Sequence, residues 1–85
     1  MNIDEQFALA QTESKSLSEK PDNETLLKLY SLFKQGSNGD APNEGPSNPF
    51  DIVGKAKFQA WTSLKGISQE EAKKKYIELV ASLKD

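Results

Sequence analysis

Hydrophobic residues recur every three or four positions in four segments of the chain, which is the spacing of one face of an α-helix. We expect helices over residues 3–15, 23–35, 51–66 and 68–83. No segment shows a sustained alternation of apolar and polar residues, the pattern of a half-buried strand. Four helices of this kind, each with one apolar stripe, predict an all-α protein in which the stripes meet in a bundle.

Residues that begin and end helices support these boundaries. Ser68 and Glu71 form an S-x-x-E capping box at the start of the fourth helix. Gly36 and Gly66 are expected to end the second and third helices, because glycine readily adopts the left-handed conformation that follows a last turn. Residues 36–50 hold three glycines and three prolines, so we expect a long loop there, without helix or strand.

Composition limits the kinds of partner. The chain has 85 residues, which suits one small domain, and we expect residues 1–85 to form it. Acidic residues number 13 and basic residues 11, giving a net charge of -2, so generic binding to nucleic acid is disfavoured. Every basic residue is a lysine, and the bidentate contacts that arginine makes to guanine or to carboxylates are therefore missing.

The chain contains neither cysteine nor histidine. It therefore lacks disulfides, thiolate nucleophiles, the usual zinc ligands and an imidazole base, and we expect no metal and no cofactor. Residues 1–15 carry acids where a signal peptide would have a basic region, and no apolar stretch approaches the roughly 18 residues that span a bilayer. We expect a cytoplasmic, monomeric protein with no stable insertion in a membrane.

One lysine interrupts the apolar stripe of the third predicted helix. Residues three and four apart on a helix are neighbours, so Lys57 lies between Val53 and Trp61, two residues that we expect to hold the bundle together. The ordinary interpretation is that such a lysine packs its methylenes on the apolar face and leaves its ammonium in water. The other interpretation is a contact with a ligand, and helical spacing alone leaves both open.

Aromatic residues accompany a second lysine on the second predicted helix, where Tyr30 lies beside Phe33 and Lys34. Tyr76 occupies a core-facing position of the fourth helix, with a polar hydroxyl at its tip. The two tyrosines fit the core of a plain bundle. Together with the two lysines, the aromatic residues also suit a ligand with a phosphate and a planar base, although the chain has neither a P-loop nor a G-x-G-x-x-G motif.

Two longer motifs are more specific. They are LLKLYSLFKQGSNGD at 26–40 and GKAKFQAWTSLKGISQEEAKKKYI at 54–77. The chain resembles the acyl-CoA-binding protein family in these motifs, and the similarity extends over essentially its whole length. The resemblance implies an antiparallel four-helix bundle of up-down-down-up order. It also implies that the protein binds long-chain fatty acyl-CoA thioesters without transforming them, with the 3′-phosphate and adenine of CoA in a shallow bowl and the acyl chain in an apolar groove.

The resemblance further implies six residues that contact the acyl-CoA ligand: Lys15, Tyr30, Phe33, Lys34, Lys57 and Tyr76. Among them, Tyr30, Lys34 and Lys57 are expected at the phosphates and Phe33 at the adenine, while the tyrosine of the fourth helix is expected at the nucleotide end. Lys15 is a further basic contact that helical spacing does not single out. The family usually has tyrosine where this chain has Phe33, so we expect one hydroxyl and its hydrogen bond to be lost.

The leading hypothesis is a non-catalytic intracellular carrier and buffer of acyl-CoA. An alternative is a helical protein-interaction module that has no CoA ligand and receives a partner helix near Tyr30, Phe33 and Trp61. A third hypothesis is an acyl-CoA thioesterase or isomerase that uses Asp40 or Glu44 of the loop. This enzyme hypothesis has little support, because neither acid has a recognisable base or nucleophile as its partner.

Overall fold

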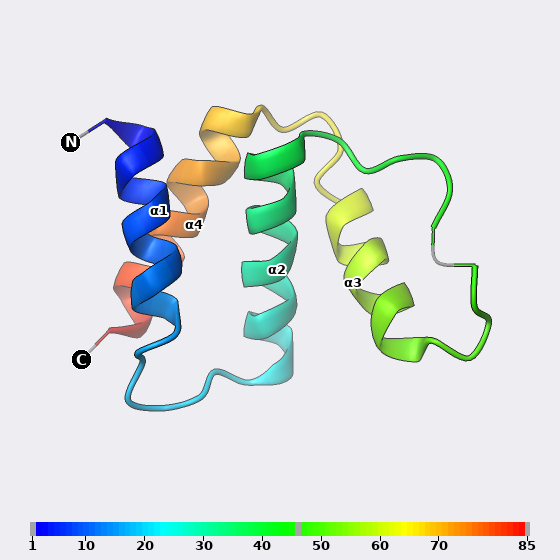
Figure 1. Cartoon of the computed structure of the whole chain (residues 1–85), viewed down its shortest axis with the longest axis horizontal. Helices are drawn as coiled ribbons and strands as arrows, with labels where there is room; N and C mark the ends of the chain where they lie inside the picture. The colour runs from blue at the N-terminus through cyan, green and yellow to red at the C-terminus, as the bar shows by residue number, and fades with distance from the viewer. Residues whose placement is uncertain (1, 46, 85) are drawn as a thin grey trace.

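The computed structural model describes residues 2–45 and 47–84; Met1, Pro46 and Asp85, which belong to the expected domain and loop, lie outside the described residues. The described residues form helices and connecting segments and contain no strand, so the all-α prediction is confirmed. The helices are α1 (Ile3–Ser14), α2 (Asn23–Asn38), α3 (Ile52–Thr62) and α4 (Gln69–Leu83) (Figure 1).

Helices α1 and α4 run in one direction and α2 and α3 in the other, which is the predicted up-down-down-up order (Figure 1). Helix α4 packs against both α1 and α2, while α2 is the one described helix that α3 packs against. The molecule is flat, with extents of 38 × 28 × 15 Å, and α1 and α3 lie at opposite edges. Among the described helices, α1 and α3 each pack against one other helix, so both keep more of their surface exposed than α2 and α4.

Polar side chains cap the start of every described helix. Such a cap matters because the first N–H groups of a helix have no acceptor within it. The capping side chains accept from the N–H group three residues further on, at 2.8 to 3.1 Å, and belong to Asn2, Asp22, Asp51 and Ser68. The capping role predicted for Ser68 is confirmed.

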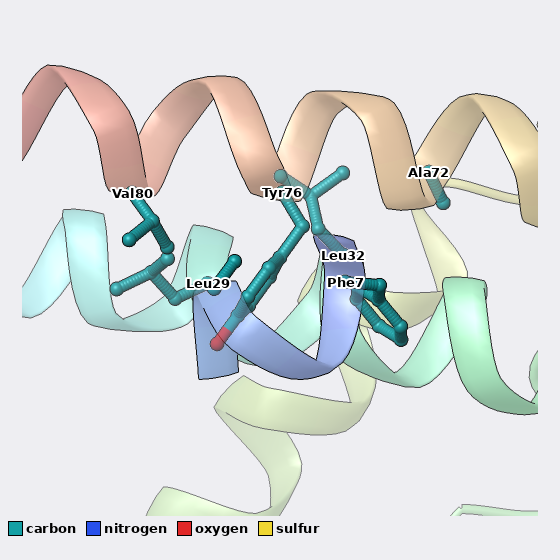
Figure 2. Close-up of a cluster of buried hydrophobic side chains, with 7 residues drawn as sticks. Phe7, Leu29, Leu32, Ala72, Tyr76 and Val80 are labelled. Carbon is teal, nitrogen blue, oxygen red and sulfur yellow. The ribbon is translucent and has the colours of Figure 1, made fainter. Parts of the chain in front are cut away.

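The core lies where α4 meets α1 and α2 (Figure 2). Its buried side chains are Phe7, Ala10, Leu29, Leu32, Ala72, Tyr76 and Val80. The Phe7 ring stacks on Phe33 with 6.1 Å between ring centroids and meets Tyr76 edge-on at 5.2 Å. These three rings connect the core to the surface between α1 and α2.

The prediction that Gly36 ends the second helix is wrong. Helix α2 continues through Gly36 to Asn38 and is followed by Gly39, which has a φ of 83°. Gly36 is buried, and a Cβ atom added there would lie 3.1 Å from both Lys73 Cγ and Phe7 Cζ. Glycine at this position therefore lets the Phe7 ring of α1 and Lys73 of α4 lie close against α2, a tertiary requirement that local sequence does not reveal.

Helix α3 begins as predicted, with Asp51 as its N-cap, but ends earlier than predicted. It ends at Thr62, and a turn over 63–66 leads towards α4. Trp61 is buried as predicted, but Val53 is 66% exposed, so the prediction that Val53 holds the bundle together is wrong. The reason is that α3 packs on one helix only, and its first turn has no second surface against which to bury.

The long loop between α2 and α3 passes along the outer side of α3 (Figure 1). At its start, the Trp61 indole Nε1–H donates to the carbonyl oxygen of Gly39 at 2.9 Å. Further along, Gly45 lies so close to the Phe58 ring that a Cβ atom added there would be 2.9 Å from it. The described part of the loop is therefore packed on α3 and lies away from the space between α1 and α2.

Candidate functional site

A hollow of about 270 Å³ opens between α1 and α2 and reaches α4. We call it the α1–α2 hollow. Four of the six predicted ligand residues lie together here, although they come from α2, α4 and the C-cap of α1: Lys15, Tyr30, Phe33 and Tyr76. The complete lining is Gln11, Ser14, Lys15, Leu29, Tyr30, Phe33 and Tyr76.

Aromatic rings form the apolar part of the α1–α2 hollow. Phe33 is half-buried and is supported from behind by the Phe7 ring on which it stacks. Tyr76 is buried in the core (Figure 2). Its hydroxyl donates to Ser14 Oγ at 3.3 Å. Because the stacking fixes the Phe33 ring and polar groups surround it, this surface suits a planar heteroaromatic group.

Sequence reasoning did not assign three residues of this hollow to the site: Gln11, Ser14 and the buried Leu29. Gln11 stands four residues before Lys15, so helical spacing places both on one face of α1. That spacing was the signal that could have found Gln11 once Lys15 was assigned. Ser14 gives no such signal, because its contact depends on Tyr76 reaching it from a helix that is distant in the sequence.

Lys57 belongs to α3 but contacts α2. Its Nζ atom lies 5.1 Å from the centroid of the Tyr30 ring, within the range of a cation–π interaction. Lys57 is exposed, so its charge remains available to an anion, and Tyr30 itself lines the α1–α2 hollow. Lys57, which interrupts the apolar stripe of α3, is thus held beside the α1–α2 hollow by the packing of α3 on α2.

Lys34 occupies a different environment. Its Nζ atom lies 4.9 Å from the centroid of the Trp61 ring, and the side chain is half-buried between α2 and α3. This position is outside the α1–α2 hollow, where the structure gathers four of the other predicted residues. A phosphate contact by Lys34 therefore stays a prediction.

A second depression, the α2–α3 groove, has a volume of about 400 Å³. Its lining is mainly aliphatic: Asn23, Leu26, Leu27, Ile52, Val53, Ala56 and Lys57. Exposed aliphatic surface of this kind suits a hydrocarbon chain, and Val53, 66% exposed, is part of it. Lys57 lines this groove and also contacts Tyr30 of the α1–α2 hollow, so the two depressions adjoin at this pair.

Asp40 holds the start of the long loop. Its Oδ1 atom accepts from the backbone N–H of Gly66 at 3.0 Å and from Gln35 Nε2 at 2.8 Å. These two bonds, the Gly66 bond more strongly, favour the carboxylate and hold the pKa of Asp40 below its ordinary value of 3.8. The fully buried Gln35 also donates to the Ile67 carbonyl at 2.8 Å. A carboxylate committed to these structural bonds weakens the hypothesis of Asp40 as a catalytic acid.

Lysines supply the charge at both depressions, with Lys15 in the hollow and Lys57 in the groove. Within residues 2–45 and 47–84, acidic side chains do not gather in groups of three or more that could hold a metal ion. In the same part of the chain, no helix has both the length and the apolar content needed to cross a membrane.

The fold is that of a small helical bundle, and its aromatic hollow and adjoining aliphatic groove, each lined by a lysine, suit an amphipathic ligand with an anionic aromatic end and a hydrocarbon end. Residues 4–80 match the sequence profile of the family described as acyl CoA binding protein. The chain belongs to this family, and the resemblance seen in its motifs is confirmed.

Known proteins similar to this chain cover nearly all of it. The acyl-CoA-binding protein homolog of Manduca sexta is 45% identical over 83 residues, which are 98% of this chain and 92% of that protein. The crystal structure of Oryza sativa acyl-CoA-binding protein 2 is similar with a TM-score of 0.87 and 33% sequence identity. That comparison covers 96% of this chain and 90% of the rice protein, so the predicted bundle is confirmed at the level of the whole fold.

One similar protein carries the name of an enzyme. Enoyl-CoA delta isomerase 2 of Rattus norvegicus is 40% identical over 77 residues. These residues make up 91% of this chain but 19% of the isomerase. The similarity therefore concerns a small part of that enzyme.

Proposed function

We propose that this protein binds long-chain fatty acyl-CoA and carries it in the cell without changing it. The observation that supports this most is the pair formed by Lys57 and Tyr30, because it joins an aromatic hollow to an aliphatic groove. An acyl-CoA thioester has the matching chemistry, a phosphorylated adenine nucleotide at one end and an alkyl chain at the other. The alternative of a helical interaction module without a CoA ligand is not favoured by the family to which the chain belongs.

The nucleotide end is assigned to the α1–α2 hollow. Phe33, backed by Phe7, offers a ring on which adenine can stack. Lys15 and Lys57 offer ammonium groups for the phosphates, and charge-assisted hydrogen bonds of this kind are about twice as strong as neutral ones. Tyr30, which contacts Lys57 and lines the hollow together with Lys15, offers its hydroxyl. Lys34 is included as a phosphate contact, reached by rotation of its flexible stem away from Trp61.

The acyl chain is assigned to the α2–α3 groove. Each methylene removed from water there contributes about 0.8 kcal/mol, a gain that a membrane or a micelle offers equally. Contacts to the phosphates add what a bilayer does not provide, namely recognition of the CoA end. Selectivity for the thioester over a free fatty acid then follows from the need for both halves of the site.

Binding without turnover is part of the proposal. The chain has no histidine or cysteine. Asp40, one of the two loop acids of the enzyme hypothesis, accepts hydrogen bonds from Gly66 N–H and Gln35 Nε2. We further propose that residues 1–85 act as one domain and as a monomer in the cytoplasm.

Titration calorimetry tests the proposal directly. Palmitoyl-CoA should bind tightly, whereas palmitate alone and CoA alone should each bind much more weakly, because each fills one depression. Chromatography of the ligand after long incubation should recover the intact thioester. No heat of binding with palmitoyl-CoA would refute the carrier function, and recovery of free CoA would indicate a hydrolase.

A further inference from the structure

The most exposed apolar side chains of the described structure gather at the start of α3. Phe50 is 88% exposed, Ile52 77% and Val53 66%. Phe50 belongs to the loop, while the other two lie in the first turn of α3 and line the α2–α3 groove. We call these three residues the apolar lip. It stands at the edge of the molecule farthest from α1 (Figure 1).

Hydrogen bonds hold the backbone of the lip in place. The backbone N–H of Phe50 donates to Asn48 Oδ1 at 2.9 Å, and Lys55 Nζ donates to the Pro49 carbonyl at 3.1 Å. The Asp51 side chain caps α3 by accepting from Gly54 N–H at 2.9 Å. Phe50 is therefore presented to solvent by a braced turn, although an apolar ring in water is unfavourable unless something covers it.

The charge around the lip indicates what covers it. Segment 47–57 contains two lysines, Lys55 and Lys57, and one acid, Asp51, so its formal charge is +1 while the whole chain has -2. On the α2 side of the groove, Asn23 lies between two further acids, Asp22, whose carboxylate caps α2, and the exposed Glu24. Both lysines are exposed, and the Asp51 carboxylate is engaged with the helix N-terminus. Apolar side chains flanked by lysines suit a lipid surface, where rings enter the interface and ammonium groups meet lipid phosphates.

Other occupants fit less well. A stable contact between two protein copies needs about 20 to 30 residues on each side, far more than the three of the lip. An acyl chain in the α2–α3 groove would cover Ile52 and Val53, but Phe50 lies outside the groove lining and would stay exposed. Phe50 is thus the residue that separates docking on lipid from binding of ligand.

We propose that the apolar lip docks the protein transiently on phospholipid membranes, with Phe50 as its leading side chain. Docking in this way brings the open end of the α2–α3 groove to the lipid surface, so an acyl chain can pass between bilayer and groove without crossing water. The role in loading rests on the proposed function. Docking itself does not, because it is measured with lipid alone.

Sedimentation with phospholipid vesicles tests docking. Vesicles of phosphatidylcholine, with and without phosphatidylserine, are mixed with the wild-type protein, Phe50→Ser and the control Leu9→Ser. Leu9 is also an exposed apolar residue (45%), but it lies on α1 at the opposite edge. Because Phe50→Ser removes a ring that docking would bury, its partition coefficient should fall roughly tenfold, and Leu9→Ser should match the wild type. Binding should be stronger to the anionic vesicles and weaken with salt.

Two further measurements separate docking from ligand binding. Phe50→Trp should show a blue shift of its fluorescence on addition of vesicles, while Leu9→Trp should not. In solution without lipid, octanoyl-CoA should bind equally to Phe50→Ser and to the wild type.

Several results would overturn the proposal. One is that the wild-type protein binds neither kind of vesicle. Another is that Phe50→Ser and the wild type bind vesicles equally. A third is that Phe50→Ser loses affinity for octanoyl-CoA, which would place Phe50 in the ligand site. If the protein bound vesicles but not acyl-CoA, the proposed function would be refuted, while the proposal that the apolar lip docks on membranes would stand.

Discussion

The ammonium of Lys34 lies 4.9 Å from the centre of the Trp61 ring, so a predicted ligand residue contacts a predicted core residue. Both lie between α2 and α3, and Trp61 in addition donates to the Gly39 carbonyl at the start of the long loop. This pair differs from Lys57 and Tyr30, which face the two depressions. We therefore expect Lys34 to affect stability as well as binding, and Lys57 to affect binding alone.

Removal of Lys34 should lower stability. Lys34→Ala loses a partly buried cation–π contact, and the free energy of unfolding should fall by about 0.5 to 1 kcal/mol. Urea denaturation of Lys34→Ala, Trp61→Leu and the double variant measures the coupling between the two side chains. Lys75→Ala, which removes an exposed lysine of α4, is the control. A coupling energy of zero would mean that the contact contributes nothing.

Lys57→Ala should instead weaken the binding of acyl-CoA. A hydrogen bond to a charged group contributes about 1.5 to 3 kcal/mol, and this is the loss of binding free energy that we expect. The fold should persist, because Lys57 is exposed, and circular dichroism should be unchanged. Calorimetry with palmitoyl-CoA measures the effect against Lys75→Ala. Full affinity in Lys57→Ala would remove this residue from the phosphate contacts.

Phe33→Tyr should tighten binding. The substitution keeps the ring that stacks on Phe7 and restores the hydroxyl that the family usually has at this position. One neutral hydrogen bond contributes about 0.5 to 1.5 kcal/mol, so we expect a gain in affinity of that size. Calorimetry with palmitoyl-CoA on the wild type and Phe33→Tyr measures the gain. The same titration with adenosine 3′-phosphate tests whether the gain arises at the nucleotide end. A gain for palmitoyl-CoA without one for the nucleotide would contradict the assignment of Phe33 to adenine.

The helices could be predicted from the sequence because their causes are local. Ser68 caps α4 by accepting from the N–H of Glu71, three residues further along the chain. The period of the apolar residues likewise predicts a helix without reference to the helix it packs against. The prediction that Gly36 ends the second helix was wrong, because a glycine is needed there to make room for Phe7 and Lys73, which are distant in the sequence. The prediction that Val53 is buried was wrong, because the periodicity of α3 does not reveal how many other helices pack against α3.

The candidate site was predictable only in part for the same reason. Helical spacing indicated Lys57 and Tyr30 one by one, but their meeting depends on how α3 packs on α2. Lys15 required the family resemblance, since its place beside Tyr76 is set by the contact of α1 with α4. The α2–α3 groove was beyond sequence reasoning, because apolar residues that face a groove and apolar residues that face a core follow the same period.

Acidification should release the start of the long loop. The pKa of Asp40 is lowered in the folded protein, chiefly by Gly66 N–H and then by Gln35, so its contribution to stability is complete above the ordinary value of 3.8. That contribution is lost as the pH falls from 3.8 through the lowered pKa. Asp40→Asn should therefore be less stable at neutral pH and lose less stability on acidification. Thermal unfolding between neutral and acidic pH measures both.

The matched control for Asp40 is Glu44→Gln, which removes an exposed carboxylate from the same loop. It should follow the wild-type pH profile closely. If Asp40→Asn and the wild type lost stability in parallel on acidification, the two hydrogen bonds to Asp40 would not stabilise its charged form.

The α2–α3 groove predicts a dependence on acyl chain length that one substitution should change. Val53 lines the groove and is exposed in the free protein, so Val53→Ser should leave the fold intact while it removes apolar surface from the groove. Affinity for palmitoyl-CoA should fall, by an amount comparable to one or two methylenes at about 0.8 kcal/mol each, whereas butanoyl-CoA should bind as before. Calorimetry over butanoyl-, octanoyl- and palmitoyl-CoA gives the slope of binding free energy against chain length, with Leu9→Ser as the control on a distant surface. An equal loss for every chain length would show that Val53 acts through the nucleotide end, and the assignment of the groove to the acyl chain would then be wrong.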